Sequence, residues 1–270
     1  MTLSRGQIIS ILLWAVLIAY SIFALRHCAV KSSGTTCTDI EAIVTDSSER
    51  RFITPEIIKN ILKTKNIKTI GKDIEDINTL DIEKVLLSDP YIRKAKVYTS
   101  MDGKLHIEVS QRVPFLRIQS DNGYSLYLTK NGYVLPVRNH FFADVPIITG
   151  APPLPFAKDF SGSLEQIYKD GNISSKNLTF VSDLTDFVDF LYSDSFWNAQ
   201  IVQINALRNG DLELIPRAGD AVILLGNLDG YEQKLDKLLK FYRKGLAYEG
   251  WSGYKYIDIR FNGQVVCRKA

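Results

Sequence analysis

Residues 89–114 read DPYIRKAKVYTSMDGKLHIEVSQRVP and contain two stretches in which apolar and polar side chains alternate. Successive side chains of a strand point to opposite faces of a sheet, so this period of two predicts two strands that each bury one face. The four residues between them, SMDG, end in glycine and predict a tight turn. The residues predicted to face inward are Ala95, Val97, Leu105, Ile107 and Val109.

Two short helices and another strand are predicted before this hairpin. Thr54 followed by Pro55 indicates a helix start, because threonine caps free N–H groups and proline lacks the N–H that would be unpaired at the first position. Asp81–Leu87 is the second helix, and Asp39–Thr45 alternates like a strand. The order strand, helix, helix, strand, strand predicts a three-stranded sheet with one face covered by two helices.

Nearer the amino terminus, Ile8–Leu25 reads IISILLWAVLIAYSIFAL, which is 18 residues without a charge. A helix of that length extends about 27 Å, close to the hydrocarbon thickness of a bilayer. A buried core helix is usually shorter and is seldom uncharged on all sides. A signal peptide has a hydrophobic stretch of about 7–15 residues before small residues, whereas Arg26-His27-Cys28 follows here. The stretch therefore predicts a transmembrane helix.

The orientation of this span does not follow from charge, because Arg5 precedes it and Arg26 follows it. A long domain after a first helix crosses the membrane largely regardless of its charge. We therefore expect residues 1–7 to form a cytoplasmic stub and the bulk of the chain to be periplasmic, with residues 26–36 as a polar linker.

Composition excludes several classes of protein. A hydrophobic content of 46% with 13 Tyr, 13 Phe and 3 Trp is enough to build cores, so disorder is excluded as the main state. The net charge of +3 and the mixing of both signs argue against a nucleic-acid binder. Cys28, Cys37 and Cys267 have no metal-site spacing. Either a disulfide between Cys28 and Cys37 or free thiols fit the sequence.

The second half of the chain predicts a sheet with helices. Residues 151–175 are rich in proline and glycine and predict a loop. Residues 180–192 predict a helix with one apolar face. Asp229-Gly230-Tyr231-Glu232 predicts a capping box that opens a long helix, which Gly245 ends. The predicted strands cover residues 115–118, 124–128, 133–137, 201–205, 211–216, 221–226, 254–261 and 264–268, the last two joined by a turn at Asn262-Gly263.

Several stretches resemble one known family. Asp89–Val97 and Leu105–Pro114 are similar to segments of its POTRA domain, with Gln111 where Glu is more usual. Tyr127–Pro136, Val145–Gly150 and Lys255–Phe261 are similar to segments of its second domain. On these residues the chain resembles the FtsQ/DivIB cell division proteins, in the version found in Bacteroidetes. The resemblance implies an α+β fold, with a POTRA domain at residues 37–111 and an FtsQ-type β domain at residues 112–270.

No arrangement of residues predicts enzyme chemistry, a cofactor or a metal. His27, His106 and His140 are scattered, and each is expected to be a surface residue. Gly250-Trp251-Ser252-Gly253 lacks the glycine spacing of a nucleophile elbow. We therefore expect no catalytic, cofactor-binding or metal-binding residues.

With enzyme chemistry excluded, we expect the protein to act by binding other proteins, and the last predicted strand indicates the binding site. Almost nothing follows it, so its outer edge is expected to be uncovered, and such an edge can accept a partner strand. The resemblance implies FtsB/FtsL-type single-span division proteins as partners there, other division proteins on the POTRA domain, and a non-enzymatic scaffold at the septum. The alternative is a POTRA-containing envelope assembly or secretion component. The predicted partner-binding residues are Phe241, Tyr242, Arg260, Phe261, Asn262, Gly263, Gln264, Val265 and Val266.

Overall fold

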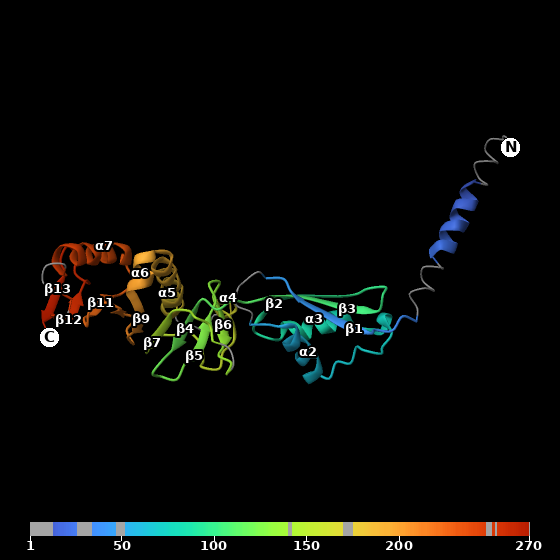
Figure 1. The fold of residues 1–270 in the computed structure, drawn as a ribbon, viewed down its shortest axis with the longest axis horizontal. Coiled ribbons are helices and arrows are strands. Elements are labelled where there is room, and N and C mark those ends of the chain that lie inside the picture. Colours follow the sequence, from blue (N-terminus) through green and yellow to red (C-terminus); the bar gives the residue numbers. More distant parts are fainter. Residues whose placement is uncertain are drawn as a thin grey trace. The chain divides into compact units, whose positions relative to one another are not determined.

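The computed structural model describes residues 13–25, 34–46, 52–139, 142–169, 175–246, 250–251 and 253–269. These fall into two units, Met1–Gln111 and Arg112–Ala270. Figure 1 labels their helices and strands along the chain.

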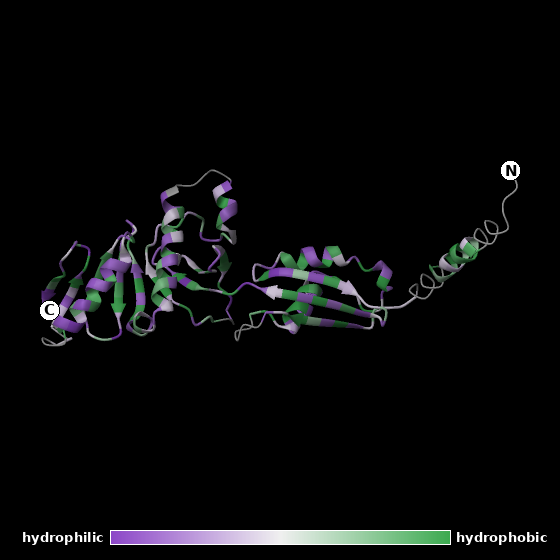
Figure 2. Ribbon diagram, turned by 90° about the horizontal axis from the view of Figure 1, so that it is seen from above, coloured by the Kyte–Doolittle hydropathy of each residue, from purple (hydrophilic) through white to green (hydrophobic). Residues whose placement is uncertain are grey.

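Residues 13–25 form a helix whose side chains are mostly exposed, including Leu13, Trp14 and Phe23. In Figure 2 this helix is largely coloured as hydrophobic. Across the described parts of the chain, no helix has both the length and the apolar character that a membrane crossing requires. The structure thus does not confirm the expected span at 8–25, whose first five residues lie outside the described ranges.

The first unit has the predicted order of strand, helix, helix, strand, strand. Its elements are β1 (Asp39–Val44), α2 (Pro55–Thr64), the 3-10 turn η1 (Ile74–Asp76), α3 (Thr79–Leu87), β2 (Ile92–Thr99) and β3 (Lys104–Gln111). The sheet order is β1-β3-β2, with β1 parallel and β2 antiparallel to the central β3. Parallel pairing of β1 with β3 requires a crossover, which the two helices and β2 supply. The predicted three-stranded sheet is confirmed.

Local chemistry starts both helices of this unit. The Thr54 hydroxyl accepts a hydrogen bond from the Ile57 amide at 3.4 Å, and Pro55 stands at the start of α2, as predicted. The Asn78 side chain accepts from the Asp81 amide at 3.2 Å, so α3 begins at Thr79, two residues before the predicted start. The five residues predicted to face inward on β2 and β3 are buried, with the exception of Ala95, which is half-buried.

The second unit is built on one mixed sheet of ten strands. Its strands are β4 (Leu116–Gln119), β5 (Ser125–Leu128), β6 (Tyr133–Pro136), β7 (Ile147–Gly150), β8 (Gly162–Ser163), β9 (Ile201–Ala206), β10 (Leu212–Pro216), β11 (Val222–Gly226), β12 (Tyr254–Asp258) and β13 (Val266–Lys269). Their order is β13-β12-β11-β10-β9-β7-β4-β5-β6-β8. The pairs β4–β7, β7–β9 and β11–β12 are parallel.

Helices cover one face of this sheet. They are α4 (Leu164–Lys169), α5 (Ser175–Ser193), α6 (Ser195–Gln200), α7 (Tyr231–Phe241) and the π-helical segment η2 (Tyr242–Leu246). In Figure 1, α7 runs alongside β11 to β13. Leu184, Phe187 and Val188 of α5 are fully buried in one core with Leu214 of β10 and Ile223 of β11. The predicted α+β class is confirmed for this unit.

Two short helices were not predicted. The region 151–175, predicted as a loop, contains β8 and α4, and α6 follows α5 after a single residue. Six residues are too few to display a helical period, and α4 has only one buried residue, Ile167. The start of α6 does have a local signal, because the Asp194 carboxylate accepts hydrogen bonds from the amides of Phe196 at 2.8 Å and Trp197 at 3.0 Å.

The predicted boundaries of α7 are wrong at both ends. Its N-cap is Gly230, with φ +61° and no side-chain cap bond, so Asp229 and Glu232 do not form the predicted capping box. Asp229 instead accepts a hydrogen bond from Asn227 Nδ2 at 2.6 Å. Gly245 does not end the helix, because the chain continues through it as the π-helical segment.

The terminal hairpin is wider than predicted. Pairing stops at Asp258 and Val266, so the strands do not reach the predicted turn at Asn262-Gly263. The Asp258 carboxylate accepts a hydrogen bond from the Arg260 amide at 3.1 Å, which turns the chain out of the sheet two residues after the strand ends.

Candidate functional site

The last strand, β13, lies at one end of the ten-stranded sheet, as predicted. It pairs antiparallel with β12, and the strand order places no other described strand against it. Half of the backbone N–H and C=O groups of an edge strand point away from its neighbour. The outer side of β13 can therefore form a ladder with an added strand.

The side chains of β13 divide between the two faces of the sheet. Val265 and Cys267 are half-buried and pack against the core, while 45% of Val266 is exposed. Arg268 and Lys269 are also exposed and give the end of the strand a positive charge. The face opposite the core thus offers Val266 and Arg268, while Lys269 is exposed at the end of the strand on the side of Cys267.

The loop between β12 and β13 is fastened at two points. The Arg260 guanidinium binds the Asp258 carboxylate through Nε at 2.9 Å and through a second nitrogen at 2.6 Å. Lys237 Nζ of α7 donates to the carbonyl oxygen of Ile259 at 2.9 Å and to that of Phe261. Burial lowers the pKa of Lys237, and the charge of Asp258 opposes this shift. These contacts fix the backbone at Ile259 and Phe261, and the Phe261 side chain is 46% exposed.

Two predicted site residues, the last of α7 and the first of η2, differ in their surroundings. Phe241 is half-buried and packs edge-on against Tyr254 of β12, with ring centroids 6.4 Å apart. Tyr242 is only 4% exposed and its ring lies 4.9 Å from that of Trp251. Burial raises the pKa of Tyr242 to about 12. Tyr242 is therefore a core residue, and contact with a partner would require α7 to move.

The remaining predicted residues lie in the connecting loop. Asn262, Gly263 and Gln264 are exposed, and Gly263 has φ +71°. Of the predicted residues, the structure leaves six exposed, keeps Phe241 and Val265 half-buried against the core, and buries Tyr242. It also adds Lys237, whose contacts with the loop no local sequence pattern indicates.

Both units match family models of known proteins. Residues 113–268, more than half of the chain, match the family model described as FtsQ/DivIB, C-terminal related. The chain belongs to the FtsQ/DivIB family. Residues 35–110 match the model of a POTRA-like domain. The resemblance found in the sequence is confirmed.

Curated relatives of this FtsQ/DivIB-family chain are cell division proteins. It is 26% identical over 214 residues to cell division protein DivIB of Clostridium tetani, covering 77% of this chain and 72% of the relative. It is 26% identical to cell division protein FtsQ of Salinibacter ruber over 66% of this chain and 65% of the relative. It is 26% identical to cell division protein FtsQ of Rhodothermus marinus over 70% of this chain and 66% of the relative. This chain therefore spans somewhat less than two thirds of the two FtsQ proteins.

FtsQ/DivIB-family proteins are non-enzymatic division proteins, which agrees with the expected absence of enzyme activity. Within the described residues, no group of three His, Cys, Asp or Glu side chains could hold a metal ion. His106 stacks on Tyr98 and lies 3.0 Å from the Ser100 hydroxyl on the sheet of the first unit. His27 and His140 lie outside the described ranges.

Proposed function

We propose that this FtsQ/DivIB-family chain is a non-enzymatic scaffold of cell division, which binds FtsB/FtsL-type single-span proteins by adding one of their strands to β13. By this binding it couples early to late division proteins, so that septal peptidoglycan synthesis begins at the division site. The relatives, which are named cell division proteins, support the cellular process.

The outer edge of β13, with which no described strand pairs, is the observation that carries the proposed mode of binding. Strand addition takes its affinity from main-chain hydrogen bonds and its specificity from side chains beside the strand. The outer edge of β13 supplies the backbone groups, and Val266 and Phe261 supply exposed apolar contacts. Lys237 and Asp258 hold the adjoining loop in place before a partner arrives, which lowers the entropy cost of binding.

We further propose that residues 8–25 anchor the chain in the cytoplasmic membrane, with residues 1–7 in the cytoplasm and both domains in the periplasm. The uncharged sequence and the exposed apolar side chains of residues 13–25 support this anchor. Confinement to one membrane raises the effective concentration of partners that are anchored in the same way. A reporter enzyme active only in the periplasm, fused after the last residue, should be active and should lose activity when residues 8–25 are deleted.

The test of the edge is co-purification of the full chain with the FtsB/FtsL-type proteins of the same bacterium. Val266→Asp and Phe261→Asp should each prevent recovery of these partners, because a charge would lie beside the added strand. Val202→Asp is the matched control, because Val202 of β9 is 42% exposed on the same sheet but lies away from the edge. Circular dichroism checks that each variant is folded.

Undiminished recovery with both edge variants would place the partner elsewhere. Equal loss with Val202→Asp would show that the effect is not local to the edge. Recovery of outer-membrane barrel proteins alone would favour the alternative function in envelope assembly or secretion. The family match of residues 113–268 argues against that alternative.

A further inference from the structure

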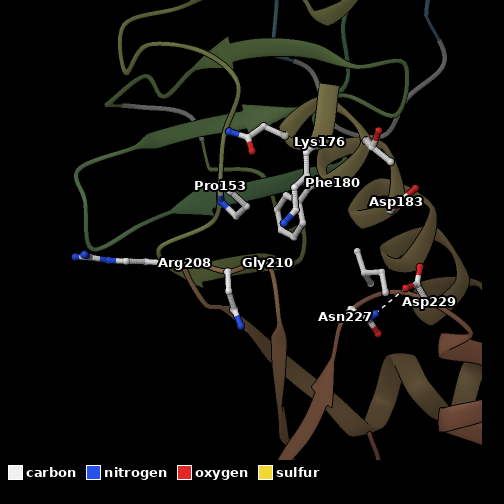
Figure 3. A pocket seen from close by; sticks show the side chains of 12 residues that line it. Pro153, Lys176, Phe180, Asp183, Arg208, Gly210, Asn227 and Asp229 are labelled. Carbon is white, nitrogen blue, oxygen red and sulfur yellow. Dashed lines mark hydrogen bonds between the residues drawn. The ribbon is translucent and has the colours of Figure 1, made fainter. Parts of the chain in front are cut away.

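A cleft of about 530 Å³ opens in the second unit beside the ends of β9 and β11, and no residue of β13 lines it. Four segments that are far apart in the sequence form it: the chain after β7 at Pro153, the first turns of α5, the turn between β9 and β10, and the turn between β11 and α7 (Figure 3). Its volume falls within the range of about 300–1,000 Å³ typical of ligand sites. Neither the sequence patterns nor the proposed function uses it.

The middle of the cleft is apolar. Phe180 of α5, Leu228 and Pro153 line it, and Phe180 and Leu228 also pack against the core. Gly210 lies beside Phe180 with φ +90°, and a Cβ atom there would lie 3.4 Å from the Phe180 ring. The absence of a side chain at Gly210 leaves the ring open to the cleft, as Figure 3 shows.

One side of the cleft is acidic. Asp183 of α5 and Asp229 before α7 lie there, and Asn227 Nδ2 donates to the Asp229 carboxylate at 2.6 Å. Burial raises the pKa of Asp183, and the charges of Asp186 and Asp229 raise it further. Among the described residues, no donor or cation pairs with the Asp183 carboxylate. A cation placed between Asp183 and Asp229 would relieve their repulsion.

The other side is basic. Arg208 of the β9–β10 turn borders the cleft on the side opposite Asp183 and Asp229, and in Figure 3 its side chain extends outward, away from Phe180. Lys176 lines the cleft from the first turn of α5. Both side chains belong to exposed residues, and within the described residues neither has a hydrogen-bond or ion-pair partner. Arg208 can therefore bind a carboxylate through two parallel hydrogen bonds.

We propose that this cleft binds a short segment of a partner protein, which places a Lys or Arg side chain at Asp183 and Asp229, an apolar side chain on Phe180, and an acidic side chain at Arg208. A simple anion does not fit, because the two carboxylates would repel it. A metal ion does not fit, because the site offers two carboxylates and no third ligand of that type. A peptide is the ligand class that carries both charges on either side of an apolar group.

The test uses three probe peptides and the full chain in lipid nanodiscs, with binding followed by ligand-observed NMR. The probes are Gly-Lys-Leu-Leu-Glu-Gly and its two single-charge forms, in which Gln replaces either Lys or Glu. Asp183→Asn should weaken the two Lys-containing peptides about tenfold, the loss of one charge-assisted hydrogen bond, and leave the form with Glu alone unchanged. Arg208→Gln should weaken only the two Glu-containing peptides.

Asp236→Asn is the matched control, since Asp236 lies on the exposed side of α7 and pairs with Lys240 at 2.6 Å. It should change none of the three affinities. Equal binding of all probes to every variant, or no binding at millimolar concentration, would overturn the proposal. Val266→Asp should leave peptide binding intact and Asp183→Asn should leave recovery of FtsB/FtsL-type proteins intact, so the two sites succeed or fail separately.

Discussion

Replacing Gln111 with alanine should destabilise the first unit, because this polar side chain continues the inward-facing series of Leu105, Ile107 and Val109. Gln111 ends β3 and is only 2% exposed. Its side-chain oxygen accepts hydrogen bonds from the amides of Phe52 at 2.9 Å and Ile53 at 3.1 Å. Phe52 and Ile53 are themselves buried, so the single oxygen of Gln111 satisfies two N–H groups that water does not reach.

The expected loss follows from those two groups. A buried donor left without a partner costs about 1–3 kcal/mol, so two of them give about 2–6 kcal/mol. That is a large fraction of the roughly 5–15 kcal/mol that stabilises a domain. Gln111→Glu keeps an oxygen acceptor for both amides and should lose less.

Hydrogen exchange of the Phe52 and Ile53 amides is the decisive assay, together with urea unfolding followed by circular dichroism. Trp197 and Trp251 lie in the second unit, so their fluorescence should report an unchanged transition there. Gln119→Ala, at an exposed position of β4, is the control. Unchanged exchange at both amides in Gln111→Ala would refute the reasoning.

Three further changes test the second unit. Gly150→Ala should destabilise it by at least about 1–3 kcal/mol in urea unfolding, because φ is +83° and a Cβ would overlap the carbonyl oxygen of Ala206. Burial raises the pKa of Asp258, but hydrogen bonds from the side chain and amide of Arg260 outweigh it and leave the pKa below its usual value. The stabilising effect of the Asp258 carboxylate is therefore fully present above its unfolded pKa of about 3.9 and is lost as the pH falls through the folded pKa. In urea unfolding at decreasing pH, the free energy of unfolding of Asp258→Asn should therefore fall less steeply than that of the unchanged protein. Burial raises the pKa of Tyr242 to about 12, so its neutral form stabilises the fold below an unfolded pKa of about 10, and this stability is lost as the pH rises through the folded pKa. In an absorbance titration of the tyrosines, Tyr242→Phe should remove the ionisation step near pH 12.

Most elements of the fold could be predicted from the sequence because their signals are local. Alternation at Leu105, Ile107 and Val109 marks a strand with one buried face, and these residues are buried. Thr54 and Pro55 mark a helix start whichever fold surrounds them. The wrong predictions concern α4, the start of α7 and the terminal turn. α4 has only six residues, too few to show a helical period. At the other two places a nearby residue forms a hydrogen bond with the side chain on which the prediction or the turn depends. Asp229, for example, has the right spacing for a cap but binds Asn227.

The predicted edge position of β13 agrees with the strand order of the sheet, although the pairing that leaves β13 at the end is a property of the tertiary structure. The burial of Tyr242 could not be predicted, because its place on an apolar helix stripe does not tell whether Trp251 packs over it. Only the tertiary structure brings Phe180, Gly210 and Asp229 to one cleft, because α5 packs on the sheet near the turns that follow β9 and β11. Residue periodicity records which side of an element is buried, whereas the pairing of distant strands decides which elements meet there.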